Sequence, residues 1–313
     1  MPLEPLKETG SRLQKTLASV RAFSLTSIGL SSLIGFNVVQ TLSLAVRPVA
    51  PRTFRRFNRW CANTWWGWCV IVSEKLYRTR LILTGETVPE QENAIVVANH
   101  QQMPDILAVM ILARTKKRLG DLKFFVKKAL KWFPGVGWGM QFIDCLFVKR
   151  NWTADRNLIR ETFRHLVEND VPVWLVSFVE GTRVTPAKIE RGMEYAKQAG
   201  MTLTRHVLPP RSKGFVASVQ GLGEHVHAVY DVTIGYTEGV PNLWQYIKGS
   251  VRQMHTHVRR FPIEELPKLD AELRQWLLDR FVEKDRLLEH FYTHGAFPQE
   301  PLPVEMEAEL NSR

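Results

Sequence analysis

Apolar and polar positions follow two different patterns along this chain of 313 residues. From about residue 80 onward, short apolar runs rich in Val, Ile and Phe alternate with longer amphipathic stretches. The short runs are typical of buried strands, and the longer stretches are typical of helices. The strands are expected at 80–85, 94–98, 142–148, 171–178 and 227–236, with a further strand near 251–258. The helices are expected near 104–118, 153–169, 186–200, 213–222 and 270–292.

Strands that alternate with helices in this way predict an α/β fold. We therefore expect a mixed, largely parallel sheet flanked by helices, in one domain that covers residues 79–297. The chain is long enough for such a domain, with a sizeable core, and an appendage. Residues 298–313 carry Pro and Glu and are expected to form a flexible tail.

The N-terminal part of the chain has a different pattern, because residues 22–46 contain no charged side chain. As a helix this run would be about 37 Å long, which is enough to cross a bilayer. A second uncharged run, 60–73, is too short to span a bilayer alone, and Pro48 and Pro51 separate the two. Residues 1–78 are therefore expected to form a membrane-associated helical hairpin that anchors the protein. The alternative is a buried helix pair in the core of a soluble protein.

The composition narrows the choice of partners. Lys and Arg exceed Asp and Glu by 11, so anionic partners are favoured, whether nucleic acid, lipid headgroups or phosphorylated substrates. Four of the ten Trp residues lie between 60 and 68, and indole rings favour the membrane–water interface. This favours a lipid bilayer with anionic headgroups. A nucleic-acid partner is not expected, because no recognisable binding module accompanies the basic residues.

A first polar cluster lies in AIVVANHQQMPDILAV, residues 94–109. His100 follows the expected strand, and Pro104 suits the first turn of the helix that follows. Asp105 can direct its carboxylate back to one nitrogen of the imidazole and leave the other nitrogen free as a base. The alternative is that Asp105 only complements the helix N-terminus while His100 is an ordinary loop residue.

A second polar cluster lies in FVEGTRVTP, residues 178–186. Gly181 allows a tight turn, and Arg183 can make bidentate contacts to a phosphate. Glu180 can hold that guanidinium or contact substrate hydroxyls. The alternative is a strand and turn that carry a surface ion pair.

Two further clusters also follow expected strands. Lys149 and Arg150 come after one strand, and Pro209 and Pro210 close a strand that precedes more basic residues. Each cluster alone would be read as a solvated basic loop. Because four polar clusters follow four strands, we expect them to share one edge of the sheet.

The clusters together resemble the motifs of the glycerolipid acyltransferases. In order, these are NH-x-x-x-x-D at 99–105, the KR pair at 149–150, EGTR at 180–183 and LPP-R-x-K-G at 208–214. The chain resembles the 1-acylglycerol-3-phosphate acyltransferase family over about residues 90–298. The resemblance is strongest to the branch with the lysocardiolipin and lysophosphatidylinositol acyltransferases. Val179 stands where the family usually has Pro, and Gln101 and Gln102 stand where a basic or small polar residue is usual.

The resemblance implies a role for each motif. His100 and Asp105 would be catalytic, and Glu180, Gly181, Thr182 and Arg183 would bind the lysophospholipid, with Arg183 on its phosphate. Lys149 and Arg150 would assist with the acceptor or the anionic donor. Pro209 and Pro210 would shape the acyl channel. No metal and no cofactor are expected, and the co-substrate would be a thioester, acyl-CoA or acyl carrier protein.

The expected reaction is attack of a glycerol hydroxyl on a thioester carbonyl, with His100 as general base. The nucleophile motif G-x-S-x-G is absent, so direct transfer without an acyl-enzyme is expected. The favoured product is phosphatidic acid, made from 1-acyl-sn-glycerol-3-phosphate. The alternatives are remodelling of another lysophospholipid or a non-catalytic lipid-binding protein. The expected location is a membrane, either the bacterial inner membrane or the endoplasmic reticulum, with the catalytic domain in the cytosol.

Overall fold

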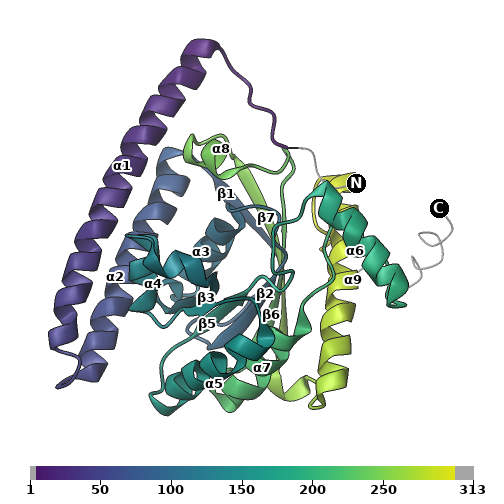
Figure 1. The fold of residues 1–313 in the computed structure, drawn as a ribbon. Coiled ribbons are helices and arrows are strands. Elements are labelled where there is room, and N and C mark those ends of the chain that lie inside the picture. Colours follow the sequence, from purple (N-terminus) through teal and green to yellow (C-terminus); the bar gives the residue numbers. More distant parts are fainter. Residues whose placement is uncertain (1–4, 300–313) are drawn as a thin grey trace.

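A seven-stranded sheet forms the centre of the molecule, for which a computed structural model describes residues 5–299 (Figure 1). The strand order is β1-β7-β6-β2-β5-β3-β4. Strands β2 to β6 run parallel to one another, whereas β7 pairs antiparallel with β6 and parallel with β1. The strands are β1 (Arg80–Gly85), β2 (Ala94–Ala98), β3 (Leu122–Lys127), β4 (Leu146–Val148), β5 (Trp174–Ser177), β6 (Ala228–Gly235) and β7 (Gln253–Pro262). The predicted mixed, largely parallel sheet is confirmed.

Helices cover both faces of this sheet. They are α1 (Arg12–Leu42), α2 (Pro51–Ile71), α3 (Asp105–Thr115), α4 (Val136–Gln141), α5 (Trp152–Glu168), α6 (Pro186–Gln198), α7 (Ser212–Leu222), α8 (Leu243–Ile247) and α9 (Asp270–His294). Alternate residues of β2 point to opposite faces. Val96 packs in a core with α2 and α3, whereas Ile95 and Val97 pack in a second core with α5, α7 and α9.

Three expectations about strands were wrong or incomplete. Strand β3 was missed because Lys123 interrupts its apolar run, but this ammonium group is buried and donates to the carbonyl of Ile143. The strand expected at 142–148 is reduced to β4, since residues 142–144 form a turn in which Asp144 adopts a φ of +59°, outside the extended region. The strand expected before Pro209 does not form, because backbone N–H groups of 205–207 bond to the carboxylate of Asp285 on α9.

Helices α1 and α2 form the hairpin that the two prolines predict (Figure 1). The second helix begins at Pro51 rather than at residue 60, so it includes the basic residues between them. Its inner face packs on the sheet domain through Trp66 and Val70, and Arg59 forms an ion pair with the buried Asp121 at 2.6 Å. The guanidinium of Arg59 is therefore engaged in an ion pair within the protein.

Helix α1, by contrast, exposes most of its apolar side chains. Residues 12–45 are long and apolar enough to cross a membrane, and only 22% of the most apolar window is buried. A core helix of a soluble protein would bury this surface. Helix α1 is therefore a candidate membrane segment. The division of the chain at residue 79 stays a prediction, and residues 300–313 of the predicted tail lie outside the described part.

Candidate active site

The four polar clusters approach one another at the edge of the sheet where β2 to β6 end. His100 follows β2, Glu180 follows β5, and Lys149 follows β4. Because these strands are parallel, their carboxyl ends lie on one side of the sheet, where α/β folds place ligand sites. The topology therefore places three of the clusters at one edge. No strand leads into the fourth, which is joined to the second by the hydrogen bond from Leu208 N–H to Glu180.

The loop between β2 and α3 places the imidazole of His100 beside the carboxylate of Asp105. The loop is fixed at its start, where the side chain of Asn99 exchanges hydrogen bonds of 2.8 and 3.0 Å with the backbone of Ile234 on β6. Pro104 then begins the helical turn, and the His100 Nδ1 lies 2.9 Å from the Asp105 Oδ2. The imidazole also stacks on the ring of Phe178 at 4.3 Å. The ring is thus held from two sides, and Nε2 is the nitrogen left for a substrate.

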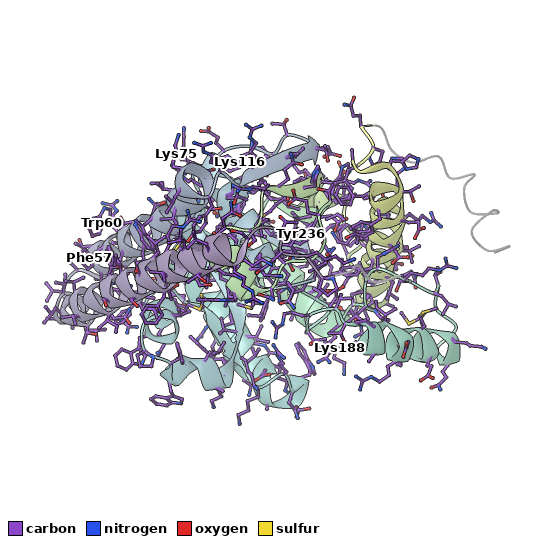
Figure 2. All side chains as sticks on the ribbon, turned by 90° about the horizontal axis from the view of Figure 1, so that it is seen from above. Phe57, Trp60, Lys75, Lys116, Lys188 and Tyr236 are labelled. Carbon is purple, nitrogen blue, oxygen red and sulfur yellow. The ribbon has the colours of Figure 1, made fainter. Side chains whose placement is uncertain are left out.

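The Asp105 carboxylate is fully buried and accepts hydrogen bonds from two further donors. The backbone N–H of Gln102 lies 2.8 Å from Oδ2, and the hydroxyl of Tyr236 lies 2.6 Å from Oδ1. Burial, followed by the charge of Asp105, raises the pKa of Tyr236 well above its ordinary value, so its hydroxyl remains a donor. Sequence reasoning missed Tyr236, which lies 131 positions from Asp105 and follows the end of β6. It lies in the interior of the domain (Figure 2).

The Glu180 carboxyl joins two loops of the site. Its Oε2 accepts the backbone N–H of His100 at 2.7 Å, and its Oε1 accepts the N–H of Leu208 at 3.0 Å. Burial raises the pKa of Glu180 to about 8, although the two backbone hydrogen bonds act in the opposite direction. Both carboxyl oxygens of Glu180 thus accept hydrogen bonds from the protein backbone. Its predicted contact with substrate stays a prediction.

A group of basic side chains lies on the other side of the site. Arg183 Nη1 donates to the Gln102 side chain at 3.0 Å, and Lys188 Nζ donates to the Thr182 hydroxyl at 2.7 Å. Partial burial, followed by the charges of Arg183, Arg191 and Arg150, lowers the pKa of Lys188. The three guanidinium groups are therefore close enough to the Lys188 ammonium group to repel it, and an anion would relieve this repulsion. Lys188, which sequence reasoning missed, lies on α6, away from the hairpin residues Phe57 and Trp60 (Figure 2).

Gly181 is required by the turn that leads to Arg183. Its φ is +68°, and a Cβ atom there would lie 3.0 Å from the side chain of Arg211. Both observations exclude a larger residue without strain.

The Lys149–Arg150 pair and the two prolines occupy the rim of the site. Asp155 accepts the backbone N–H of Lys149 at 2.9 Å, and Arg150 adopts a φ of +65°, so this turn leaves both side chains exposed. Pro209 packs against Gly192 on α6. The roles of Lys149 and Arg150 in binding the acceptor or the donor, and of the prolines in an acyl channel, stay predictions.

Helix α9 supports the site from behind, and sequence reasoning did not assign it this role. The side-chain amide of Gln101 is buried and donates to Tyr292 and to Ile234, at 2.9 Å each. Lys284 is fully buried on the same helix and pairs with Asp231 on β6. Gln101 is thus turned toward the protein interior, whereas Gln102 lies on the side of Arg183. Only the second glutamine is placed to influence a bound acceptor.

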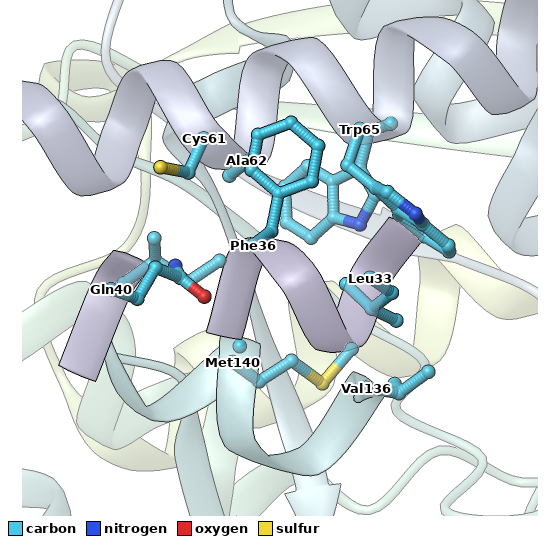
Figure 3. Close-up of a pocket in the computed structure, with 11 residues that line it drawn as sticks. Leu33, Phe36, Gln40, Cys61, Ala62, Trp65, Val136 and Met140 are labelled. Carbon is cyan, nitrogen blue, oxygen red and sulfur yellow. The ribbon is translucent and has the colours of Figure 1, made fainter. Parts of the chain in front are cut away.

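A small apolar cavity lies between the hairpin and α4 (Figure 3). It measures about 40 Å³ and is lined by Leu33, Phe36, Trp65, Val136 and Met140, among others. This volume accommodates a methyl group or two but no long acyl chain. Among residues 5–299, no group of three or more His, Cys, Asp or Glu side chains is placed to hold a metal ion.

Comparisons with known proteins identify relatives of this chain. The family model described as "Acyltransferase" matches residues 80–237, and the model "Acyltransferase C-terminus" matches residues 245–311. The 1-acyl-sn-glycerol-3-phosphate acyltransferase 2 of Arabidopsis thaliana is 36% identical over 85% of this chain and 70% of its own length. The human 1-acyl-sn-glycerol-3-phosphate acyltransferase gamma is 34% identical, over 89% and 78%. The crystal structure of the acyltransferase PlsC from Thermotoga maritima is 18% identical with a TM-score of 0.49, and the match covers 87% of this chain and 96% of that one.

Proposed function

The chain belongs to the acyltransferase family, and on that premise we propose that it acylates 1-acyl-sn-glycerol-3-phosphate to give phosphatidic acid. The acyl donor in this proposal is acyl-CoA. The observation that carries the proposal is the buried, hydrogen-bonded pair of His100 and Asp105 at the carboxyl ends of parallel strands. The relatives are named for 1-acyl-sn-glycerol-3-phosphate, which supports the choice of acceptor.

His100 acts as the general base in this mechanism. The acceptor hydroxyl is a poor nucleophile near neutral pH, and Nε2 of His100 takes its proton as the oxygen attacks the thioester carbonyl. Asp105 holds the ring through Nδ1 and stabilises the imidazolium that forms. The tetrahedral intermediate then expels the CoA thiolate, which takes the proton from His100. The acyl chain is thus bonded to the acceptor oxygen, and the base is regenerated.

In this proposal the phosphate of the acceptor binds to Arg183, Lys188 and Arg150, which are three of the four side chains of the basic group. Their positive charges are close together, and a phosphate neutralises them while it accepts several hydrogen bonds. Gln102 orients the Arg183 guanidinium from the side of His100. Gln102 therefore lies between the general base and the phosphate site. It can set the distance between the phosphate of the acceptor and the hydroxyl that attacks the thioester.

The location in this proposal is a membrane, with helix α1 in contact with lipid. Its exposed apolar side chains support this, since acceptor and product are both amphiphiles. Transfer of an acyl chain through water would cost about 0.8 kcal/mol for each methylene. An enzyme at the interface avoids this cost.

The test is a reaction of purified full-length protein with labelled acyl-CoA and a panel of lysophospholipids, with products identified by mass. We expect labelled phosphatidic acid as the main product. Labelled phosphatidylinositol or cardiolipin as the main product would make the chain a remodelling enzyme and refute the proposed acceptor. Transfer from acyl carrier protein but not from acyl-CoA would refute the proposed donor.

A further inference from the structure

The segment from Lys127 to Trp138, here called the aromatic loop, lies at the same edge of the sheet as the active site. It begins where β3 ends, and β3 pairs with β5, which leads into Glu180. On its other side β3 pairs with β4, which leads into Lys149. The aromatic loop is therefore a neighbour of two active-site loops, although neither the His–Asp pair nor the basic group uses it.

The aromatic loop exposes large apolar side chains to solvent. Trp132 is 75% exposed and Phe133 is 56% exposed, and Leu130, Val136 and Trp138 are also exposed. Single exposed apolar residues are common, but a group of this size marks a surface that contacts lipid or another protein.

This exposure is built into the backbone. Phe133 N–H donates to Leu130 O at 3.0 Å, and Gly137 N–H donates to Phe133 O at the same distance. The Gln141 side chain adds a bond of 2.9 Å to the Lys131 carbonyl. These hydrogen bonds hold the backbone of the loop in the conformation that presents the rings to solvent. The rings therefore stay available to a partner.

The charges around these rings favour an anionic lipid surface over a protein partner. Lys127, Lys128 and Lys131 belong to the aromatic loop, and no Asp or Glu occurs between residues 122 and 143. Trp next to Lys is typical of segments at the membrane interface, where the ring enters the headgroup region and the ammonium group meets lipid phosphates.

The aromatic loop is also continuous with the exposed face of the hairpin. Gly135 packs on Leu33 of α1, where a Cβ atom would come within 3.2 Å of that side chain. Val136 and Met140 face Leu33 across the small cavity (Figure 3). Helix α1 exposes Ile34 and Val38 near this contact. One apolar surface thus runs from the candidate membrane helix to the edge of the active site.

We propose that the aromatic loop is a second membrane-contact surface, which inserts Trp132 and Phe133 into the headgroup region of an anionic bilayer beside the active site. This inference rests on the proposed function, because it explains how a bilayer acceptor reaches His100. The hairpin attaches the protein to the membrane, and the aromatic loop orients the active site toward it. The acceptor phosphate can then meet Arg183 while its acyl chain stays in the lipid.

The first test measures the depth of the loop in a bilayer. Phe133→Cys in the full-length chain is labelled with bimane and bound to vesicles of phosphatidylcholine and phosphatidic acid that contain a shallow doxyl lipid. The matched control is Tyr195→Cys on α6, since Tyr195 is 59% exposed but lies outside the aromatic loop. Unsubstituted protein, treated with the same label, corrects for its own cysteines.

We expect quenching by doxyl lipid and protection from iodide at position 133, and neither at position 195. A label at position 133 that stays open to iodide on vesicle-bound protein would overturn the proposal. Protection that arises with a cell extract in the absence of vesicles would assign the surface to a protein partner and would also overturn it.

The second test compares two presentations of the acceptor. The double variant Trp132→Ser, Phe133→Ser is assayed on long-chain lysophosphatidate in vesicles and on a short-chain, monomeric form. The control variant is Tyr195→Ser, Leu203→Ser. We expect kcat/KM to fall about tenfold on vesicles for the loop variant only, with no change on the monomeric acceptor.

An equal loss on both acceptors would contradict the proposal, since it would point to a structural role. The two tests separate this inference from the proposed function. Lipid quenching at position 133 without acyl transfer by the wild type would refute the function alone. Acyl transfer without quenching would refute membrane contact by the aromatic loop and leave the proposed function intact.

Discussion

The two sides of the active site are built in opposite ways. On the His100 side, the Asp105 carboxylate is fully buried and accepts hydrogen bonds from the imidazole, Gln102 and Tyr236. On the Arg183 side, Lys188 is half-buried, and the positive charges of exposed arginines, Arg183 among them, act on it. In the proposed mechanism, the first side is fixed before substrate arrives, whereas the second gains stability only when an anion binds. The proposal thus separates a group that does chemistry, which must be oriented in advance, from groups that bind.

The largest effect is expected from Asp105→Asn on the fixed side. The amide has nearly the shape of the carboxylate but can hold the wrong tautomer of His100 and cannot stabilise the imidazolium. We expect acyl transfer to fall about 10³-fold, with circular dichroism and vesicle binding unchanged. Retention of more than a tenth of the activity would show that the pair is not the catalytic base system.

The next effect is expected from Arg183→Ala on the binding side. The loss of a charge-assisted contact to phosphate should raise the acceptor KM roughly 10- to 100-fold and change kcat less. The matched control is Arg160→Ala on the exposed face of α5, which should leave both constants unchanged. A fall in kcat at constant KM would mean that Arg183 acts in the chemical step and not in acceptor binding.

Tyr236→Phe should produce a smaller loss on the fixed side. The variant removes one of the donors to Asp105 and should lower kcat about tenfold at unchanged acceptor KM. Tyr195→Phe is the control. A rise in the acceptor KM at unchanged kcat would mean that Tyr236 supports acceptor binding and not the His100–Asp105 pair.

The smallest effect concerns stability and involves Glu180, which joins the two loops. Burial raises its pKa to about 8 from an ordinary value of 4.5, so the folded protein favours the neutral carboxyl. The unfolded chain loses this proton first, and the free energy of unfolding should therefore fall as pH rises from 4.5 to about 8. In Glu180→Gln this contribution is absent. Thermal unfolding midpoints measured across this range should fall more steeply for the wild type, and parallel curves would contradict the shift.

The sequence predicted the elements whose local pattern agrees with their final environment. Strand β2 is apolar throughout and is buried on both faces, and Pro104 correctly marks the start of α3. Strand β3 was missed because its buried Lys123 is satisfied by a carbonyl 20 positions away, which no local pattern can indicate. The absent strand before Pro209 has the same kind of cause, since Asp285 on α9 takes its backbone donors.

The candidate site, too, was predictable from the sequence only where its residues are close together along the chain. His100 and Asp105 are five positions apart, so a strand followed by a helix places them together without help from other regions. Tyr236 follows the end of β6 and Lys284 lies on α9, and only the assembled fold brings them to the site. Gln101 and Gln102 are adjacent in the chain but face opposite directions, one toward Tyr292 and one toward Arg183. Sequence reasoning treated the two glutamines alike because local spacing does not reveal that choice.

Direct acyl transfer with His100 as the base can be tested by following the labelled acyl group. Wild-type protein and His100→Ala are mixed with labelled acyl-CoA and 1-acyl-sn-glycerol-3-phosphate, and the labelled lipid and labelled protein are quantified over time. We expect labelled phosphatidic acid with the wild type, none above background with His100→Ala, and no labelled protein in either case. Phosphatidic acid formed at the wild-type rate by His100→Ala, or an acyl group trapped on the wild-type protein, would contradict this mechanism.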